Sequence, residues 1–303
     1  MRIAILSRKA SLYSTRRLTQ AARSRGHTVR VMNPLDFTMV LSSQNPEMYY
    51  RGRKLSPTPD AVIPRIGSSI TFYGLAVVRQ FEMMGVYCLN ESNAIARSRD
   101  KLRALQLLSR SHEIGVPPTA MARRPEYARR LLSHVGGAPV IVKLIQGMQG
   151  AGVVIADSKQ SFDSVIDAFH AIGQNILIQS FVKEAEGGDI RALVVGRRVA
   201  AAMTRRAVEG EFRSNVHLGG TAKRAKLPPE YRRAAVAAAR QMGLAVAGVD
   251  MLASDEGPMI MEVNSSPGLE GIERSSGIDV ADAVIAYVER NAGRGRTRDK
   301  VGR

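Results

Sequence analysis

Three oxygen-bearing side chains near the end of the chain could hold a divalent cation. Asp250 lies in the apolar run 248–252, and Glu262 and Asn264 lie in the run 259–264, with a turn-forming Asp-Glu-Gly-Pro segment between them. Side chains alternate along a strand, so Glu262 and Asn264 share one face and a hairpin brings Asp250 opposite Glu262. Two carboxylates this close repel each other unless a proton or a cation lies between them, and an all-oxygen ligand set suits Mg²⁺ or Mn²⁺ rather than zinc. The spacing therefore predicts a metal site.

Two other interpretations of this hairpin stay open. A structural salt bridge would also satisfy the carboxylates, but neither run contains Lys or Arg, which favours the metal. A hairpin whose polar side chains simply face water would require Leu252 and Ile260 to share that face. The other face is apolar and is expected to pack on a core, through Val249, Met251, Met261 and Val263.

A glycine-rich loop is the second candidate feature. A β-branched run containing Lys143 precedes the segment 147–152, Gly-Met-Gln-Gly-Ala-Gly, and another strand-like run follows it. Glycine lets backbone amides approach a ligand closely, although such a hairpin is more often a flexible turn. The strand, loop, strand order differs from the P-loop and from the dinucleotide-binding motif. Because magnesium held by few protein ligands commonly leaves positions for nucleotide phosphates, the loop and the metal residues together indicate a nucleotide site.

A third loop, 210–220, is bounded by glycines and contains Arg213 and Asn215. An arginine there could neutralise charge on a phosphoryl group or an acyl phosphate. A solvated loop arginine is the alternative, because the chain is rich in arginine. His217 lies in the same loop, and the sequence assigns it no role.

Composition agrees with a sizeable enzyme, and 303 residues with 45% hydrophobic content should form two or three domains. The formal net charge of +17 would attract polyanions or acidic polypeptides. No basic stripe interleaved with aromatic residues is present and tryptophan is absent, which argues against stacking on single-stranded bases. The apolar run 3–6 is too short for a signal peptide or a membrane span. We therefore expect a cytoplasmic protein without membrane association.

Cysteine usage narrows the chemistry further. Cys88 is the one cysteine of the chain, which excludes an internal disulfide framework and a cysteine-rich zinc site. It lies in a short apolar run, where a buried thiol in a strand is favoured over a reactive nucleophile.

The elements that must position these residues begin with an α/β region. Strands are expected at 3–7, 28–32, 61–64 and 86–89, with helices at 14–24 and 72–84, which indicates a mostly parallel sheet. The polar segment 41–58 is expected to be a surface loop, and a helix is expected at 95–111. Later helices are expected at 125–134, 161–172 and 229–242, and later strands at 140–144, 153–156, 176–178, 190–195 and 198–204.

Together these residues carry a family resemblance. The motifs are Lys143 with its glycine loop, residues 189–191, 212–215, Asp250 and residues 262–268. They resemble the ATP-grasp fold, and within it the chain is identified as a member of the RimK-type ligases. Further segments mark that subfamily: 5–8, 64–67, 70–74, 79–83, 89–92, 99–102 and 266–273. The similarity extends to about residue 289.

The resemblance implies an α/β chain in which an N-terminal pre-ATP-grasp domain precedes two α+β ATP-grasp lobes. The expected divisions are an N-terminal domain at 1–95, a central lobe with the glycine loop at 96–180, a C-terminal lobe with the metal site at 181–290 and a basic disordered tail at 291–303.

The resemblance also implies ATP between the lobes and an ADP-forming acid–amino-acid ligase. Asp250, Glu262 and Asn264 would hold Mg²⁺ or Mn²⁺, and Arg213 and Lys143 would act in catalysis. The ATP-binding residues would be Lys101, Lys143, Gly147, Gly150, Gly152, Gln179, Ser180, Phe181, Asp189, Arg213, Ser214 and Asn215. The chain departs from the family at the segment joining the lobes, where Gln179 and Ser180 stand in place of an acidic residue that could meet the adenine amino group.

The reaction implied is addition of L-glutamate to the C-terminus of ribosomal protein six of the small subunit, through an acyl phosphate. The family also implies a homo-oligomer and proximity to the ribosome. Another acceptor remains possible, namely a cofactor, a carrier protein or free glutamate. A basic ribosome- or RNA-binding factor that retains an unused ATP site is the alternative from another class.

Overall fold

The structure is a computed structural model, and it describes residues 1–42, 46–145, 152–185, 187–208 and 220–293. The described residues form four sheets, each of which packs against at least one helix. The predicted site residues Gly147, Gly150, Arg213, Ser214 and Asn215 lie outside the described residues. Within the described residues no helix is long and apolar enough to cross a membrane.

The N-terminal sheet is parallel, in the order β2-β1-β6-β7, as the sequence predicted. Alternation along β1 sends Ile3 and Ile5 to the core that includes α1 and α9, and Ala4 and Leu6 to the core that includes α2. The elements are β1 (Arg2–Leu6), α1 (Tyr13–Ser24), β2 (Thr28–Met32), η1 (Pro34–Asp36), β6 (Ala61–Pro64), η2 (Ser68–Ile70), α2 (Thr71–Met83) and β7 (Tyr87–Cys88).

The expected surface loop at 41–58 was wrong. Two short strands lie in the middle of this region, β4 (Glu47–Tyr50) and β5 (Arg53–Lys54), and they form a small antiparallel sheet with β3 (Phe37–Val40), which precedes it. Met48 is buried in the core that contains Phe37. The ring centroids of Phe37 and Tyr50 lie 4.9 Å apart. The polar composition of the segment concealed one short strand whose Met48 is buried.

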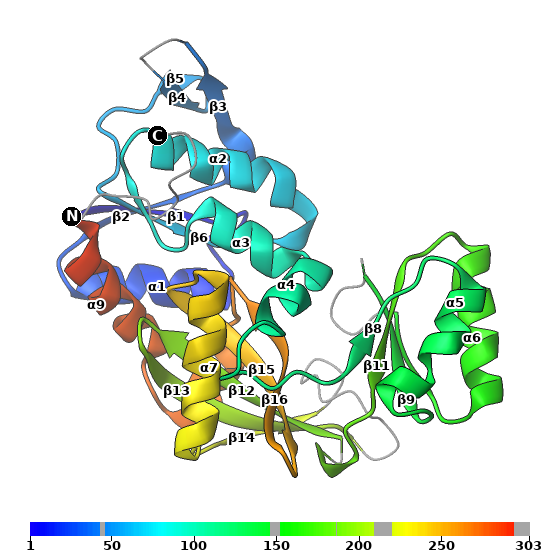
Figure 1. The fold of residues 1–303 in the computed structure, drawn as a ribbon. Helices are drawn as coiled ribbons and strands as arrows, with labels where there is room; N and C mark the ends of the chain where they lie inside the picture. Colours follow the sequence, from blue (N-terminus) through cyan, green and yellow to red (C-terminus); the bar gives the residue numbers. More distant parts are fainter. Residues whose placement is uncertain (43–45, 146–151, 186, 209–219, 294–303) are drawn as a thin grey trace.

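The central lobe stands apart from the rest of the molecule in Figure 1 and has its own core. Its antiparallel sheet has the order β10-β9-β11-β8, and Phe162 and Ile166 of α6 are buried against it. The elements are β8 (Thr119–Ala120), α5 (Pro125–Leu131), η3 (Ser133–Val135), β9 (Val140–Leu144), β10 (Val153–Ala156), α6 (Lys159–Ala171) and β11 (Ile176–Ser180).

The C-terminal lobe is built on an antiparallel sheet in the order β14-β13-β12-β15-β16. Leu193 and Val195 of β12 join the core shared with the N-terminal sheet and α9, and Ala192 and Val194 join the core under α7. The elements are η4 (Lys183–Ala185), β12 (Gly188–Val195), β13 (Arg198–Arg206), β14 (Thr221–Arg224), α7 (Pro229–Met242), β15 (Val246–Ser254), β16 (Gly257–Asn264), α8 (Glu270–Ser276) and α9 (Val280–Ala292).

The single helix expected at 95–111 was also wrong, because two helices, α3 (Ser92–Arg99) and α4 (Lys101–Leu108), meet at Asp100. Asp100 has extended backbone angles, and its carboxylate accepts a hydrogen bond of 3.0 Å from the amide of Arg103, so it caps α4. Ala104 and Leu108 lie in the same core as α7. This junction therefore packs with the C-terminal lobe.

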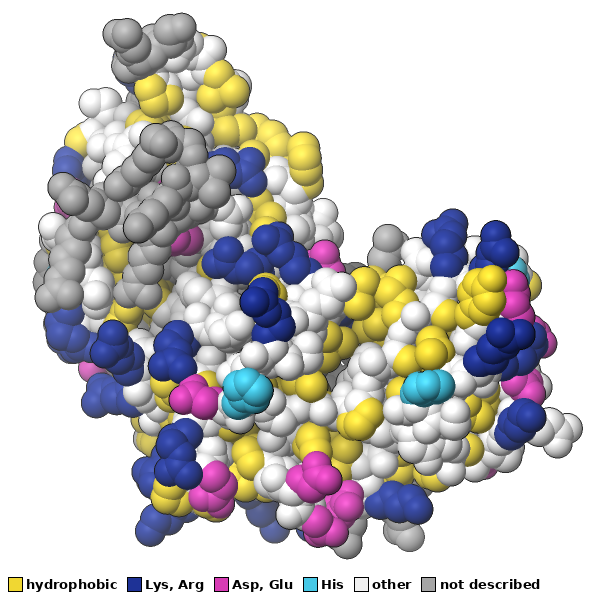
Figure 2. Space-filling model, in the orientation of Figure 1, with side chains coloured by type: hydrophobic (Ala, Val, Ile, Leu, Met, Phe, Trp, Pro, Cys, Tyr) yellow, Lys and Arg dark blue, Asp and Glu magenta, His cyan; other side chains and the backbone are white. Residues whose placement is uncertain are grey.

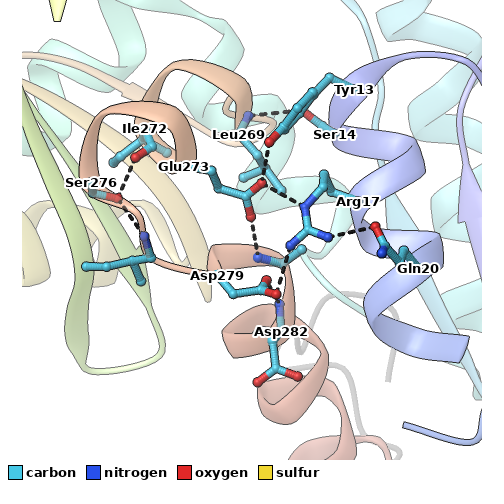
Figure 3. A network of polar contacts seen from close by, with 12 residues as sticks. Tyr13, Ser14, Arg17, Gln20, Leu269, Ile272, Glu273, Ser276, Asp279 and Asp282 are labelled. Atoms are coloured by element: carbon cyan, nitrogen blue, oxygen red, sulfur yellow. Dashed lines mark hydrogen bonds and ion pairs between the residues drawn. The ribbon is translucent and has the colours of Figure 1, made fainter. Parts of the chain in front are cut away.

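A polar network joins the N-terminal domain to the C-terminal lobe (Figure 3). Buried Glu273 of α8 accepts hydrogen bonds of 3.0 Å from the Tyr13 hydroxyl, from Arg17 Nε and from the amide of Ala281. Arg17 also pairs with Asp279 at 2.8 Å. Together with the core that spans α1, β1, β12 and α9, these bonds hold the two parts as one body.

Replacing Glu273 with Gln is expected to lower the free energy of unfolding by about 2 kcal/mol. Arg17 would lose a buried charged acceptor, and the new side-chain NH₂ group of Gln would point at a group that itself donates a hydrogen bond. Urea unfolding followed by circular dichroism measures the change. Glu270→Gln is the matched control on the same helix, since exposed Glu270 pairs with Arg274 alone among the described residues and should contribute no more than about 0.5 kcal/mol. Equal losses in the two variants would contradict a special role for Glu273.

Candidate active site

The candidate metal-binding hairpin has the predicted register. Asp250 of β15 pairs with Glu262 of β16, Gly248 pairs with Asn264, and the turn lies between Ser254 and Gly257. A Cβ at Gly248 would lie 2.8 Å from Cβ of Pro267, so glycine there lets the loop after Asn264 pack against the strand. The three candidate oxygen ligands therefore lie on adjacent strands.

A bulge between Asp250 and Met251 changes the apolar face that the sequence predicted. Met251 pairs with Ile260, and the register shift leaves Met261 unpaired. Val249, Met251 and Val263 are buried as expected, but Ile260 is buried in place of Met261, which is only half-buried. Strict alternation therefore misplaced these two residues, and Ile260 is absent from the polar face.

Asp250 forms ion pairs with two arginines. The expectation that a metal is favoured over a salt bridge at this carboxylate was therefore too strong. Arg191 donates to both carboxylate oxygens, with Nε 2.6 Å from Oδ1 and Nη2 2.5 Å from Oδ2, and Arg205 Nη2 lies 3.0 Å from Oδ2. The neighbouring strands β12 and β13 supply both arginines, so the absence of Lys and Arg from the hairpin itself did not exclude an ion pair. Although burial raises it, these guanidinium groups hold the pKa of Asp250 below its ordinary value.

Asp189 belongs to the same network. Its carboxylate accepts two hydrogen bonds from Arg205, one of them 2.6 Å from Nε, and both side chains are buried. Asp189 and Arg191 lie two residues apart and share one face of β12, which is the sequence signal that could have revealed Arg191. The alternating charges run from Asp189 through Arg205 and Asp250 to Arg191.

Glu262 differs from Asp250. Its side chain is open to water, and no hydrogen bond or ion pair engages it within the described residues. The protein that surrounds it and the nearby Asp250 carboxylate raise the pKa of Glu262 above its ordinary value, although Arg191, Lys101 and Lys143 oppose this. A carboxylate in this position is available to a cation.

The donor set fits Mg²⁺ or Mn²⁺. Glu262 has free oxygens, Asn264 Oδ1 accepts a single hydrogen bond of 2.9 Å from the amide of Ser266, and Asp250 Oδ1 accepts one from Arg191. Each oxygen carries two lone pairs, so all three side chains retain an acceptor position. No three His, Cys, Asp or Glu side chains gather elsewhere in the described part of the chain, and the third ligand here is an amide, which hard cations accept.

Two lysines face this hairpin. Lys143 of β9 donates to Gln179 Oε1 at 2.5 Å, and Gln179 in turn donates to Thr119 Oγ1 at 2.8 Å. Lys101 begins α4, and its Nζ donates to the carbonyl of Leu144 at 3.2 Å. Burial lowers the pKa of Lys143 to about 8 and also lowers that of Lys101, while the charge of Glu262 raises both. Buried Gln179 thus orients Lys143 in the structure.

The other described candidates lie at the ends of strands in the central sheet. Gly152 has φ +73°, and a Cβ there would lie 2.5 Å from Leu144, so the position requires glycine. Ser180 ends β11, where its amide donates to the carbonyl of Pro118 at 2.9 Å, and Phe181 follows it. The structure therefore places Lys101 and Lys143 near Glu262. Asp189 lies on β12, the strand that pairs with the candidate metal-binding hairpin.

Cys88 is confirmed as a buried strand thiol. It is 6% exposed, its Sγ lies 3.6 Å from the carbonyl of Val86, and burial raises its pKa well above the ordinary value. A thiol held protonated in this way is a poor nucleophile.

Comparison with known families decides what this arrangement is. The family model of the RimK pre-ATP-grasp domain matches residues 1–95, and that of the RimK-like ATP-grasp domain matches residues 98–288. The chain belongs to the RimK family of ATP-grasp ligases. This confirms the resemblance that the sequence motifs indicated.

Relatives of this RimK-family chain align with it over almost its full length. A protein of Maridesulfovibrio salexigens named probable alpha-L-glutamate ligase is 56% identical over 300 residues, which cover 99% of each chain. A protein of Nitrosococcus oceani with the same name is 57% identical over 300 residues, again 99% of each.

Solved structures show the same fold. The ATP-grasp ligase PsnB in complex with a minimal precursor has a TM-score of 0.74 at 23% identity, covering 94% of this chain and 98% of that one. A RimK domain protein from Sphaerobacter thermophilus has a TM-score of 0.65 at 21% identity, covering 95% and 100%. The predicted ATP-grasp architecture, with its N-terminal pre-ATP-grasp domain, is confirmed.

Proposed function

We propose that this RimK-family chain is an ATP-dependent α-L-glutamate ligase that extends the C-terminus of ribosomal protein six of the small subunit. The observation that carries the proposal is the meeting of Lys101 and Lys143 with Glu262, because it places phosphate-binding cations beside an available carboxylate. The curated names of the full-length relatives support glutamate as the amino acid. The acceptor rests on the resemblance of the sequence motifs.

In this proposal the ammonium groups of Lys101 and Lys143 bind ATP phosphates, and Gln179 fixes the position of Lys143. Glu262, Asn264 and Asp250 would hold Mg²⁺ or Mn²⁺, which when bound neutralises phosphate charge. The remaining ATP-binding roles, from the glycine loop through Ser180, Phe181 and Asp189 to residues 213–215, stay predictions.

The reaction proceeds in two displacements. An oxygen of the acceptor carboxylate attacks the γ-phosphorus of ATP, so that the bond to ADP breaks and an acyl phosphate forms. The amine of L-glutamate then attacks the acyl carbon, loses a proton and expels phosphate, which leaves an amide. Neither step needs a side-chain nucleophile, so the protein contributes mainly position and charge. Arg213 is proposed to neutralise the phosphoryl charge.

Intact mass spectrometry of ribosomal protein six tests the proposal after incubation with the enzyme, ATP, Mg²⁺ and L-glutamate. We expect glutamyl-sized mass increments that require all three small molecules. An acceptor truncated at its C-terminus is the matched substrate control, and D-glutamate is the control for the amino acid. ADP release with a different acceptor would retain the ligase and move its substrate, and no ADP release with any acceptor would contradict the proposal.

Binding of ATP is expected to weaken as pH rises from 7 to 9, because the pKa of Lys143 is about 8 and only its protonated form attracts phosphate. The loss should be about threefold to tenfold in affinity, since about a tenth of the lysine stays protonated one pH unit above its pKa. Calorimetric titration with a non-hydrolysable ATP analogue measures it. Lys143→Arg should flatten the profile, because arginine keeps its charge, and an equal slope in both proteins would assign the effect to another group.

Rising pH weakens ATP binding through Lys143, but it should increase the stability that Lys143 contributes to the folded protein. Its pKa in the folded protein lies below the unfolded value of about 10.4, so the unfolded chain binds more protons between these two values. The contribution of Lys143 to stability therefore rises as pH increases through this window.

The domain divisions, the homo-oligomeric state, the ribosomal setting and the cytoplasmic location stay predictions.

A further inference from the structure

Arg65 occupies a position in the N-terminal sheet where open α/β sheets commonly bind ligands. It directly follows β6, and its amide donates to the carbonyl of Leu6 at the end of β1 at 2.8 Å. In the order β2-β1-β6-β7 the chain leaves β1 toward β2 on one side and later returns to β6 on the other. The crevice at the carboxyl ends of two such strands is the topological switch point, which ligands favour.

Arg99 lies beside Arg65. Its guanidinium donates a short hydrogen bond to the carbonyl of Ile66, the residue after Arg65. Arg65 Nη2 donates to the carbonyl of Pro267 at 2.7 Å, and Pro267 is three residues beyond the metal-ligand candidate Asn264. The Arg65 guanidinium therefore lies against the loop that follows Asn264, and Arg99, from a separate element, holds the segment next to Arg65.

Neither arginine has a carboxylate partner within the described residues. The Nε atom of Arg99 is buried and makes no hydrogen bond there, and the hydroxyls of Ser265 and Ser266, in the same loop, are also buried without a described partner. Arg191 and Arg205 at the other side of the site each hold a carboxylate. Two adjacent cations without a counter-ion are costly in a partly buried position, so an anion would stabilise them.

The electrostatic environment agrees with this geometry. Burial, with a further contribution from the charge of Arg99, lowers the pKa of Arg65 to about 10, and burial lowers the pKa of Arg99 while Glu262 opposes this. The response to Glu262 places Arg99 within its electrostatic range. Arginine presents a planar fork of donors that matches a carboxylate in bidentate geometry, whereas the lysines at this site act as point charges.

We infer that Arg65 and Arg99 form a subsite for a carboxylate of a non-nucleotide substrate, next to the metal hairpin and at the switch point of the N-terminal sheet. The inference rests on the proposed function, in which both the amino acid and the acceptor carry carboxylates that do not react in a given step. A carboxylate held by these arginines orients its substrate toward Glu262 and the phosphates. The subsite thereby gives the N-terminal domain a direct part in substrate selection.

Steady-state kinetics with Arg65→Met and Arg99→Met test the subsite, with L-glutamate, acceptor and ATP each varied in turn. We expect KM for one carboxylate substrate to rise about tenfold or more, as for loss of a charged hydrogen bond, with KM for ATP unchanged within about twofold. A selective rise for glutamate assigns the subsite to the amino acid, and one for the acceptor assigns it to the acceptor tail. Arg65→Lys and Arg99→Lys should restore part of the loss, because they keep the charge without the fork.

Arg97→Met is the matched control. Arg97 lies on α3 two residues before Arg99, but its Nε donates to the carbonyl of Met242 at the end of α7, at 3.1 Å. Its loss should leave all three KM values unchanged, and thermal unfolding checks that each variant folds. A rise in KM for ATP alone, a fall in kcat with every KM unchanged, or an equal effect in the Arg97 variant would overturn the subsite.

A binding measurement separates this inference from the proposed function. Saturation-transfer NMR should detect L-glutamate on the wild-type protein and not on Arg99→Met, with the neutral diamide of glutamate as the probe control. For an acceptor-tail site, a peptide with an acidic side chain near its C-terminus should bind, and the same peptide with that side chain replaced by its neutral amide should not. Carboxylate binding that depends on Arg99 without any ADP release would uphold the subsite and contradict the ligase. Turnover with no dependence of binding on either arginine would do the reverse.

Discussion

Replacement of Glu262 by Gln should abolish ATP-dependent turnover, with kcat reduced by about a hundredfold or more, as when a preorganised charge at a reacting centre is removed. Of the two carboxylates that face each other on the strands of the hairpin, Glu262 is the one that has no partner among the described residues and that is open to water. An amide of the same shape keeps the hairpin and removes the charge that a cation needs. ADP release as a function of Mg²⁺ concentration measures the effect.

The same variant should fold as well as the wild-type protein. Because its surroundings raise the pKa of Glu262, the ionised carboxylate opposes folding, and neutral Gln removes that cost. Urea unfolding should therefore show equal or greater stability. Glu256→Gln, in the exposed turn of the same hairpin, is the matched control for activity. A fully active Glu262 variant would contradict the metal site.

Replacement of Asp250 by Asn should instead reduce both activity and stability. Asp250 is the carboxylate partner of Arg191 and shares Arg205 with Asp189. Removing its charge leaves a buried guanidinium uncompensated, which costs roughly 3–5 kcal/mol when a buried pair is broken. The expected result is a lower urea midpoint together with loss of turnover, in contrast to the Glu262 variant.

The pH dependence provides a second check on Asp250. Its pKa in the folded protein lies below the unfolded value of about 3.9. Its stabilising contribution is therefore complete above that unfolded value and is lost as pH falls toward the folded pKa. Acid unfolding of the Asn variant should begin from a lower stability and show a shallower dependence on pH below about 4. Identical acid limbs would show that Arg191 does not depend on this carboxylate.

The sequence predicted the register of the candidate metal-binding hairpin because the information for it is local. Alternation and one turn are enough to place Asp250 opposite Glu262, and the structure has that register. The arginines that neutralise Asp250 come from β12 and β13, about 60 and 45 residues away in sequence, and pairing between distant strands leaves no local pattern. The bulge that exchanged Ile260 for Met261 is equally invisible, since it breaks the alternation on which the prediction depended.

Two other elements were predicted wrongly, each for a local reason. A capping Asp100 inside an apolar helical period divides one expected helix into two, because its carboxylate accepts a hydrogen bond from the Arg103 amide in the first turn of the second helix. The strand at Met48 is too short for its pattern to outweigh polar neighbours. By contrast, the parallel N-terminal strands were predicted correctly, since runs buried on both faces are nearly continuous in hydrophobic character.

The bonds between α1 and α8 also bear on the order in which the chain folds. The hydroxyl of Tyr13 and the carboxylate of Glu273 lie 260 residues apart in sequence, and the apolar side of α1 is covered by α9 at the other end of the chain. The first sheet to leave the ribosome therefore cannot complete its core until the last helix has been synthesised. The central lobe, whose core draws on residues 120–178 alone, can close while translation continues, so the middle of this chain is able to fold before its beginning.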